Sequence, residues 1–544
     1  MTTQVLEYKE EITFSHHVCG VEVTPGFSEN HKNLLPSKVL AIVADLHRIF
    51  EPHRKELMKM RAARQARFDQ GELPQYPDKG SRVVTGKWRV APIPEDLRCR
   101  RVEITGPVNS TKMVINMLSR NAAGFRADCA MLDYEDAMKP SWKNVLDGIA
   151  NVIGAANGML SYKEPARGGG EAKLYQLDPH DMATLMVRVR GLHLLEENVR
   201  IDGEPVSAGL FDLAVNAFHM AGPLMSRGKT PKFYVPKTEH YLEARWWDRA
   251  FATVELMNGL LRSSLRATFL IETLPAAFQV EEILYELRDH AVGLNVGRWD
   301  KIFSDIKTLK THSDRVMADR GSIGMNRDWM RNYARRLIHI CHKRGAFALG
   351  GMAAFTPGRD EATRKAQTEK VIADKEMEAS WGHDGCWVSH PYFIGYAQQA
   401  FKRENQMDVI PDPDLKYPDL LPRSEGPKTL KGLCTNVRVG IAYMKGWLSD
   451  IGCVAWDDLM EDLATLEISR AQVWQWLHHE VVLDDGKAVT SELVRFVFAQ
   501  ELACILEELQ LPGDQEWIHA AGVAQKLFLE ETFSEFLSSS PNMK

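Results

Sequence analysis

Short β-forming runs alternate with longer amphipathic stretches from about residue 102 to residue 391. A chain that repeats a strand and a helix favours a parallel sheet, because a parallel crossover needs a connection as long as a helix. Eight such strands predict a closed (β/α)8 TIM barrel of the α/β class. The expected strands are 101–104, 129–132, 185–189, 232–235, 267–271, 292–296, 346–349 and 385–388.

The main alternative is a doubly wound open sheet. That fold commonly places a Gly-rich dinucleotide-binding turn directly after its first strand, and no such turn follows residue 104. The barrel is therefore favoured. The clearest expected helices between its strands are 111–119, 242–260, 276–288 and 329–343.

The chain has a different pattern on either side of the barrel region. Apolar residues recur at helical spacing from residue 38 to about residue 67, before a linker rich in Gly, Pro and Asp at 71–80. The basic stretch 54–67 is expected to be a solvated helix face, with phosphate binding as the alternative. After residue 402 repeated prolines mark a second linker, and an almost wholly helical, all-α unit is expected from there onward.

The composition argues against several classes of function. Apolar residues make up 44% and charged residues 26% of the chain, and the net charge is only −6, so no nucleic-acid partner is expected. The eight cysteines form no CxxC pair, which argues against a zinc ribbon or a dithiol redox site. No apolar run is long enough to span a membrane, and no secretory or peroxisomal signal is visible. We therefore expect a cytoplasmic protein.

Two carboxylates follow consecutive strands of the expected barrel. Glu272 comes directly after the run 267–271, and Asp300 follows 292–296 by a short turn. Catalytic groups in this fold lie at the C-terminal ends of the strands, so the two side chains should meet there. They would repel each other unless they share a cation, and Mg²⁺ typically uses one or two protein carboxylates. The alternative is that both are ordinary loop residues.

Asp462 is a second candidate for catalysis. In the stretch 457–468, which is expected to be helical, it lies at the edge of the apolar stripe formed by Leu459, Leu463 and Leu466. A carboxylate against apolar surface becomes a stronger base, which suits proton abstraction from carbon. The alternative is an Asp that is bonded to a neighbouring Arg or to the backbone.

Arg188 and Arg190 alternate at the end of the run 185–189, and so should share one face of the chain. A fixed guanidinium at the barrel mouth could stabilise a developing enolate oxygen. The acidic cluster Asp133, Glu135 and Asp136 follows another expected strand. These acids could contact the residues that bind the metal without binding it themselves, or they could form a solvated loop.

Several motifs, taken together and in this order, resemble those of the malate synthase family, specifically of its shorter A-type. The similarity runs from about residue 87 to residue 479 and more loosely beyond. The motifs are Ile104-Thr105-Gly106-Pro107, Val189-Arg190-Gly191-Leu192-His193, Tyr234-Val235-Pro236-Lys237, Ile271-Glu272-Thr273, Gly293-Leu294-Asn295-Val296-Gly297-Arg298-Trp299-Asp300, Gly350-Gly351-Met352-Ala353-Ala354 and Met460-Glu461-Asp462.

The resemblance implies three parts: an N-terminal helical clasp and linker (1–90), the barrel (91–400) and a C-terminal helical plug (401–544). It implies an acyltransferase of the glyoxylate bypass that condenses acetyl-CoA with glyoxylate and hydrolyses malyl-CoA to malate and CoA. It also implies Mg²⁺ as the cofactor, and we expect a monomer.

The same resemblance assigns roles to individual residues. Glu272 and Asp300 would hold Mg²⁺, Arg188 would stabilise the enolate, and Asp462 would be the general base. The turn from Gly297 through Arg298 and Trp299 to Asp300 would bind glyoxylate. His390 and Pro391 are expected near the CoA channel.

Two other classes of protein could share parts of this pattern. A related Mg²⁺-dependent acyl-CoA lyase would share the barrel and the metal carboxylates, but such lyases generally lack a C-terminal unit that carries the Met460-Glu461-Asp462 segment. A catalytically dead barrel that serves as a binding scaffold would be expected to have lost at least one of the proposed catalytic residues, and all of them are present.

Overall fold

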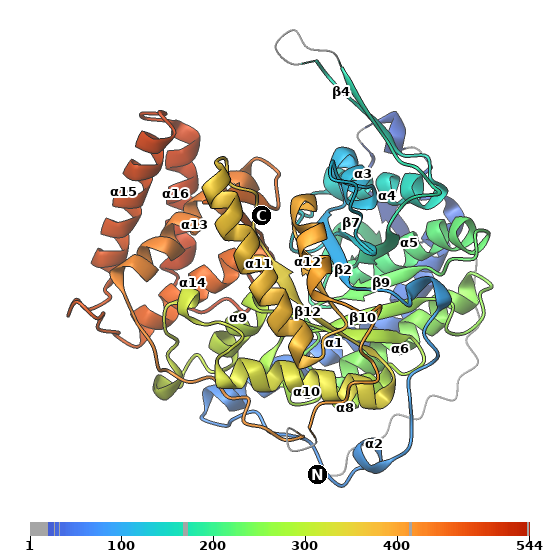
Figure 1. Ribbon diagram of the computed structural model, residues 1–544, viewed down its shortest axis with the longest axis horizontal. Coiled ribbons are helices and arrows are strands. Elements are labelled where there is room, and N and C mark those ends of the chain that lie inside the picture. Colours follow the sequence, from blue (N-terminus) through green and yellow to red (C-terminus); the bar gives the residue numbers. More distant parts are fainter. Residues whose placement is uncertain are drawn as a thin grey trace.

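Eight parallel strands close into a barrel in the computed structural model (Figure 1). The last strand pairs with the first, because Cys386, Trp387 and Val388 lie opposite Val102, Glu103 and Ile104. Each of the eight predicted runs overlaps one barrel strand, so the predicted fold is confirmed. In barrel order the strands are β2 (Val102–Pro107), β3 (Cys129–Asp133), β6 (Thr184–Arg188), β9 (Lys232–Val235), β10 (Arg266–Ile271), β11 (Ala291–Val296), β12 (Phe347–Ala353) and β13 (Gly385–Val388).

The structure describes residues 20–26, 28–31, 33–166, 172–412, 416–540 and 543. Parts of the predicted clasp and plug ranges, including residues 1–19, 541, 542 and 544, lie outside this described part. Within it the helices up to the second linker are α1 (Ser37–Asp69), α2 (Arg82–Thr85), α3 (Thr111–Leu118), α4 (Trp142–Asn157), α5 (Ala208–Met225), α6 (Tyr241–Met257), α7 (Leu274–Ala277), α8 (Val280–Glu286), α9 (Trp299–Thr308), α10 (Asp328–Arg344), α11 (Glu361–Trp381) and α12 (Ile394–Ala400).

The predicted helix 276–288 is two short helices, α7 and α8. The Thr273 side chain caps α7, and Gln279 leaves helical geometry between the two (φ −118°, ψ 23°). Three further strands form a small antiparallel sheet in the order β1 (Val21–Val23), β7 (Leu195–Ile201) and β8 (Glu204–Ser207).

The barrel is filled by side chains. Apolar groups from successive strands form an interior cluster, because alternate residues of each strand point inward. Its members include Met131, Met186, Leu270, Val292 and Trp387. The other face of the strands packs against the surrounding helices in a much larger apolar core. The strands are buried on both faces, which explains why they are continuous apolar runs in the sequence.

The long helix α1 packs across α5 and α6 on the outside of the barrel. The prediction of a solvated face for its basic half holds only in part, because Lys55, Lys59 and Arg67 are exposed whereas two arginines are buried. Arg54 and Arg61 are 5% and 4% exposed, and each forms an ion pair with a buried carboxylate. Arg61 donates to both carboxylate oxygens of Glu243 and to the backbone oxygen of Lys237. Sequence alone could not reveal these partners, because Glu243 and Lys237 are distant along the chain.

The segment 154–179 connects α4 to β6. It contains the antiparallel hairpin of β4 (Ser161–Glu164) and β5 (Lys173–Gln176), which projects from the molecule in Figure 1. Its glycine run 168–170 lies outside the described residues.

The C-terminal unit has its own apolar core and lies on one flank of the barrel (Figure 1). It is not purely helical, because a short hairpin of β14 (Val454–Trp456) and β15 (Leu459–Glu461) precedes its central helix. The expectation of an all-α unit was wrong at this point. Its helices are α13 (Leu430–Leu448), α14 (Leu463–His478), α15 (Ser491–Glu508) and α16 (Gln515–Phe528).

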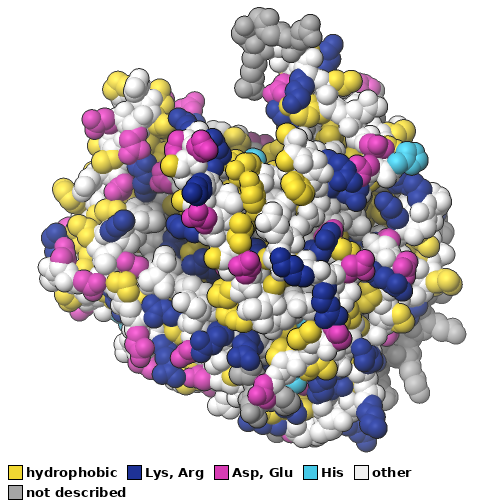
Figure 2. All heavy atoms as spheres, in the orientation of Figure 1, with side chains coloured by type: hydrophobic (Ala, Val, Ile, Leu, Met, Phe, Trp, Pro, Cys, Tyr) yellow, Lys and Arg dark blue, Asp and Glu magenta, His cyan; other side chains and the backbone are white. Residues whose placement is uncertain are grey.

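Acidic and basic side chains are interspersed over the face of the molecule drawn in Figure 2. Such a surface differs from the dense basic stripe that is typical of nucleic-acid binding. Among the described residues, no helix has the length and apolar composition needed to cross a bilayer.

We expect Arg61→Ala to lower the free energy of unfolding by about 3–5 kcal/mol, because it leaves a buried carboxylate uncompensated. Chemical denaturation of the full chain would measure this. The matched control is Arg67→Ala on the same helix, whose pair with Glu72 is about half exposed. That substitution should cost less than about 1 kcal/mol. Equal effects of the two would contradict this account of α1.

Candidate active site

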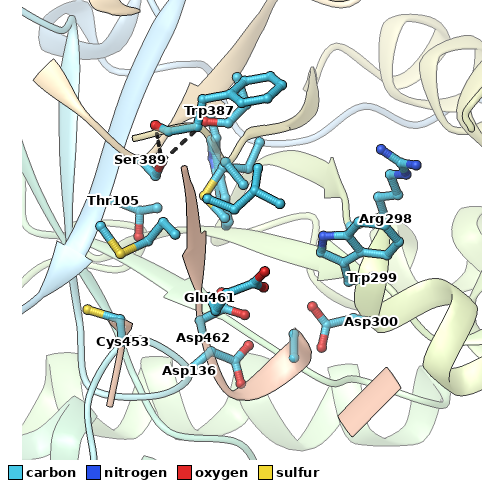
Figure 3. Close-up of a pocket in the computed structure, with 18 of the residues that line it drawn as sticks. Thr105, Asp136, Arg298, Trp299, Asp300, Trp387, Ser389, Cys453, Glu461 and Asp462 are labelled. Carbon is cyan, nitrogen blue, oxygen red and sulfur yellow. Dashed lines mark hydrogen bonds between the residues drawn. The ribbon is translucent and has the colours of Figure 1, made fainter. Parts of the chain in front are cut away.

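A cavity of about 770 Å³ lies where the C-terminal ends of the barrel strands meet the C-terminal unit. Its walls include Arg188, Glu272 and Asp300 from the barrel and Asp462 from the plug. Figure 3 shows Asp300 and Asp462 at one end of this cavity and Ser389 at the other. The structure therefore brings together four residues that the sequence placed in the site.

Glu272 and Asp300 lie at the ends of two neighbouring strands. Glu272 follows β10 directly, and Asp300 lies in the first turn of α9, after β11. Gly297 separates them: a Cβ atom there would lie 2.9 Å from Glu272 Cβ and 3.8 Å from Asp300 Cβ. Burial, followed by the charge of Asp300, raises the pKa of Glu272 to about 8. The two carboxylates thus share one water-poor site.

Arg188 is the last residue of β6 and is held in place by Asp133 at the end of β3. The guanidinium Nε donates to Asp133 Oδ1 at 2.6 Å, and Nη2 donates to Asp133 Oδ2. Asp133 also accepts from the backbone N–H groups of Glu135 and Ala137. This planar two-point contact fixes the direction of the guanidinium. Arg190, in contrast, pairs with Asp212 and Glu196 and does not line the cavity.

Lys237 is a site residue to which the sequence analysis gave no role. Its Nζ atom lies 2.9 Å from Glu135, 2.8 Å from Asp136 and 2.9 Å from Asp300, and 4.0 Å from Glu272. Its backbone adopts the left-handed region (φ 52°), which is uncommon for a residue with a Cβ. Its position two residues after β9, at the same end of the barrel, was a usable signal.

The acidic cluster is buried rather than a solvated loop. Asp133, Glu135 and Asp136 are 0%, 5% and 1% exposed. Burial alone would raise the pKa of Asp136. The positive charges of Lys237 and then Arg188 outweigh this effect and lower that pKa to about 2. Burial and then Asp136 raise the pKa of Glu135 well above its usual range. The cluster therefore surrounds the two cations of the site.

We call eight residues at this end of the barrel the mouth cluster. It contains six carboxyl groups and two cations, an excess of negative charge that burial makes costly. The members are Asp133, Glu135, Asp136, Arg188, Lys237, Glu272, Asp300 and Asp462.

Asp462 reaches the cluster from the other unit. It is the N-cap of α14 and accepts from Thr465 N, so its predicted place within a helix was wrong. The hairpin before it pairs with the segment that follows β12, because Met460 N donates to Ala354 O at 2.7 Å. Leu463, the first residue of α14, is also tied to the barrel, since its N–H group donates to Asp136 O at 3.1 Å. Burial, then Asp136 and Asp300, raise the pKa of Asp462 well above its usual range.

The turn from Gly297 to Asp300 lines the cavity, and its predicted binding of glyoxylate stays a prediction. Its backbone N–H groups are not all available to a ligand, because Gly297 N donates to Tyr333 Oη at 3.2 Å. Arg298 donates to Ile323 O and lies 4.3 Å from the Trp299 ring centre. Helix α9 begins at Trp299, so the N–H groups of its first turn lie beside the cavity.

His390 and Pro391 do not line the described cavity, whereas the preceding Ser389 does. The His390 side chain accepts from Tyr392 N and caps a short 3-10 helix that begins at Pro391. The predicted proximity of His390 and Pro391 to a CoA channel stays a prediction.

The residues present fit a divalent cation. Glu272 Oε2 is buried and has no hydrogen-bond partner, although Oε1 accepts from Lys237 N at 2.8 Å. Within the described ranges no group of three or more His, Cys, Asp or Glu side chains is arranged to hold a metal. A hard ion that uses two carboxylates and fills its other positions with water and substrate needs no such group.

The chain is similar to known proteins over most of its length. Models of the malate synthase N-terminal, TIM barrel and C-terminal domains match residues 20–77, 184–421 and 427–542. Malate synthase A of Escherichia coli (strain K12) is 44% identical over 493 residues, which cover 89% of this chain and 90% of that protein. The chain belongs to the malate synthase family.

Other malate synthases are similar over comparable lengths. That of Myxococcus xanthus is 43% identical and covers 95% of both chains, and the glyoxysomal enzyme of Gossypium hirsutum is 42% identical and covers 90% of this chain and 87% of its own. Among solved structures, a Haloferax volcanii malate synthase ternary complex aligns at 15% identity with a TM-score of 0.47, covering 79% of this chain and 99% of that one. The predicted boundaries at residues 90 and 400 stay a prediction.

We expect Lys237→Met to lower the melting temperature of the metal-free protein, because buried carboxylates lose a compensating charge. Added Mg²⁺ should raise the melting temperature of this variant by more than it raises that of the wild type, because a cation that binds the folded state stabilises it. The control is Lys232→Met: this buried lysine pairs with Asp96 and lies at the start of β9. Melting curves with and without Mg²⁺ that respond alike in both variants would contradict the expectation.

Proposed function

We propose that the protein condenses acetyl-CoA with glyoxylate and hydrolyses the malyl-CoA product to malate and CoA, as a step of the glyoxylate bypass. Membership of the malate synthase family supports this reaction. The observation that carries the proposal is the meeting of Asp462, from the C-terminal unit, with Arg188 and Asp300 of the barrel.

We propose that Glu272 and Asp300 hold Mg²⁺. The support is the shared burial of the two carboxylates, the free Oε2 of Glu272 and the negative excess of the mouth cluster. When bound, the ion supplies Lewis-acid polarisation of the glyoxylate carbonyl. A cation beside Asp300 would also offset one of the charges that raise the pKa of Asp462.

In the proposed reaction Asp462 takes a proton from the methyl group of acetyl-CoA. Its cap position turns the carboxylate toward the cavity, and its low-water surroundings strengthen it as a base. Arg188 stabilises the negative charge that develops on the thioester oxygen, because Asp133 holds its guanidinium in one orientation. The methyl carbon then bonds to the aldehyde carbon of glyoxylate, and water cleaves the thioester.

The first turn of α9 is proposed to bind the glyoxylate carboxylate. Backbone N–H groups that open a helix attract anions, and those of Trp299 and Asp300 lie beside the metal carboxylates. Gly297 would shape this wall rather than donate to it, since its N–H group donates to Tyr333 Oη. The guanidinium of Arg298 is likewise engaged by Ile323 O.

The sequence left an acyl-CoA lyase as the alternative enzyme, and membership of the malate synthase family argues against it. The hairpin that aligns Asp462 with the edge of the barrel weighs against it, because the expected lyases lack such a unit. The cytoplasmic location and the monomeric state that the sequence suggested stay predictions.

One assay tests the proposed activity. Thiol release from acetyl-CoA by the full chain should require both glyoxylate and a divalent cation. EDTA should abolish it and excess Mg²⁺ should restore it, because the carbonyl loses and regains its Lewis acid. Glyoxylate-independent thiol release, or no release under any condition, would refute the proposal.

Asp462→Asn should reduce kcat by about 10²–10⁴-fold, as is typical when a general base is lost. Mg²⁺ and glyoxylate binding, measured by calorimetry, should change little, because Asp462 comes from the other unit. The control is Asp458→Asn, an exposed acid on the same hairpin, which should keep normal turnover. Near-normal turnover of the Asp462→Asn enzyme would remove Asp462 as the base.

A further inference from the structure

The segment that follows α16 returns to the barrel. We call residues 530–540 the C-terminal strap. Three contacts tie it to α14: Trp474 Nε1 donates to Glu531 O at 3.2 Å, Arg470 Nη2 donates to Ser534 O at 2.9 Å, and Leu537 N donates to Glu467 Oε1. Helix α14 is the helix that Asp462 caps. The strap is therefore fixed to the element that carries the proposed base.

One strap residue, Phe536, reaches the barrel. Its ring stacks on His193, with 4.1 Å between ring centres and 25° between planes, and meets the edge of Phe303 at 5.8 Å. Lys307 Nζ lies 4.9 Å from the centre of the same ring. Phe303 and Lys307 belong to α9, the helix whose first turn contains Asp300. This buried ring thus adds a second contact between the plug and the helix of a proposed metal ligand, beside the direct packing of α14 on α9.

Phe536 also lines a second, very small cavity of about 10 Å³. Glu272, Asp300 and Lys237 line it together with this ring. Glu272 and Asp300 line the large cavity as well, so their carboxylates form part of the wall between the two. The space holds about one water molecule at most. Phe536 therefore fills space beside these two residues that a smaller side chain would leave open to water.

We propose that Phe536 is a positioning residue for the reaction proposed above, on which this inference rests. It holds the carboxylate pair in a water-poor site, where charge interactions are strong, and sets its place relative to Asp462 through the strap. Both effects need a large ring at this position. A shorter side chain would admit water behind Glu272 and Asp300 and loosen α9 against the plug.

The experiment compares Phe536→Ala and Phe536→Leu with Phe533→Ala in the full chain. Phe533 is the matched control, because it is buried in the same strap but packs on Trp474 and Arg470 and does not line the small cavity. Three quantities are measured: the melting temperature, the Kd for Mg²⁺ by calorimetry without substrates, and kcat and KM for both substrates.

We expect Phe536→Ala to lower kcat by about 10–10²-fold, the cost typical of a small misplacement of reacting groups, and to raise the Kd for Mg²⁺ by at least about threefold. Phe536→Leu should recover part of both. Phe533→Ala should lower the melting temperature similarly but leave kcat and the Kd for Mg²⁺ within about twofold of wild type, because it does not touch the pair.

The positioning role is overturned if Phe536→Ala leaves kcat and Mg²⁺ affinity at wild-type values, or if Phe533→Ala changes them equally at an equal loss of melting temperature. Failure of the proposed function gives a different result, because the wild type itself would then show no glyoxylate-dependent thiol release. In that case the Mg²⁺ titrations alone still decide whether Phe536 supports the carboxylate pair.

Discussion

The site depends on the balance of charge in the mouth cluster. Six carboxyl groups are held together in a water-poor space by Arg188 and Lys237, and without these two cations their mutual repulsion would push them apart. Lys237, whose Nζ atom lies 2.8–2.9 Å from three of the acids, has an unusual left-handed backbone conformation. Strain of this kind persists where the surrounding structure fixes it, and it occurs often in active sites.

Asp462 is placed by backbone hydrogen bonds rather than by its own side chain. The hairpin β14–β15 continues the edge of the barrel at Ala354 and Phe355, and α14 begins immediately after it. The plug therefore delivers one carboxylate to a defined point at the barrel mouth, although its core is separate from that of the barrel.

The sequence revealed the barrel because its strands are continuous apolar runs between amphipathic helices, and the rule that site residues follow such strands located Glu272, Asp300 and Arg188. Asp462 was predicted from its place at the edge of an apolar helical stripe, but it lies at the start of a helix, directly after a hairpin. A hairpin this short leaves almost no periodic signal in the sequence. The burial of Arg61, the role of Lys237 and the contact of Phe536 were not predicted. Each depends on a partner far away in the chain, and an unaligned sequence carries no record of such pairs.

Arg61 links the first long helix to the centre of the molecule. Its guanidinium contacts the backbone of Lys237 and lies 3.7 Å from Glu239, which in turn accepts from Lys307, the residue over the Phe536 ring. A continuous chain of buried contacts thus runs from helix α1 through the barrel wall to the C-terminal strap. The barrel is consequently not a self-sufficient catalytic module: excised from its flanks, it would keep its strands but lose the supports on both sides of its acidic centre.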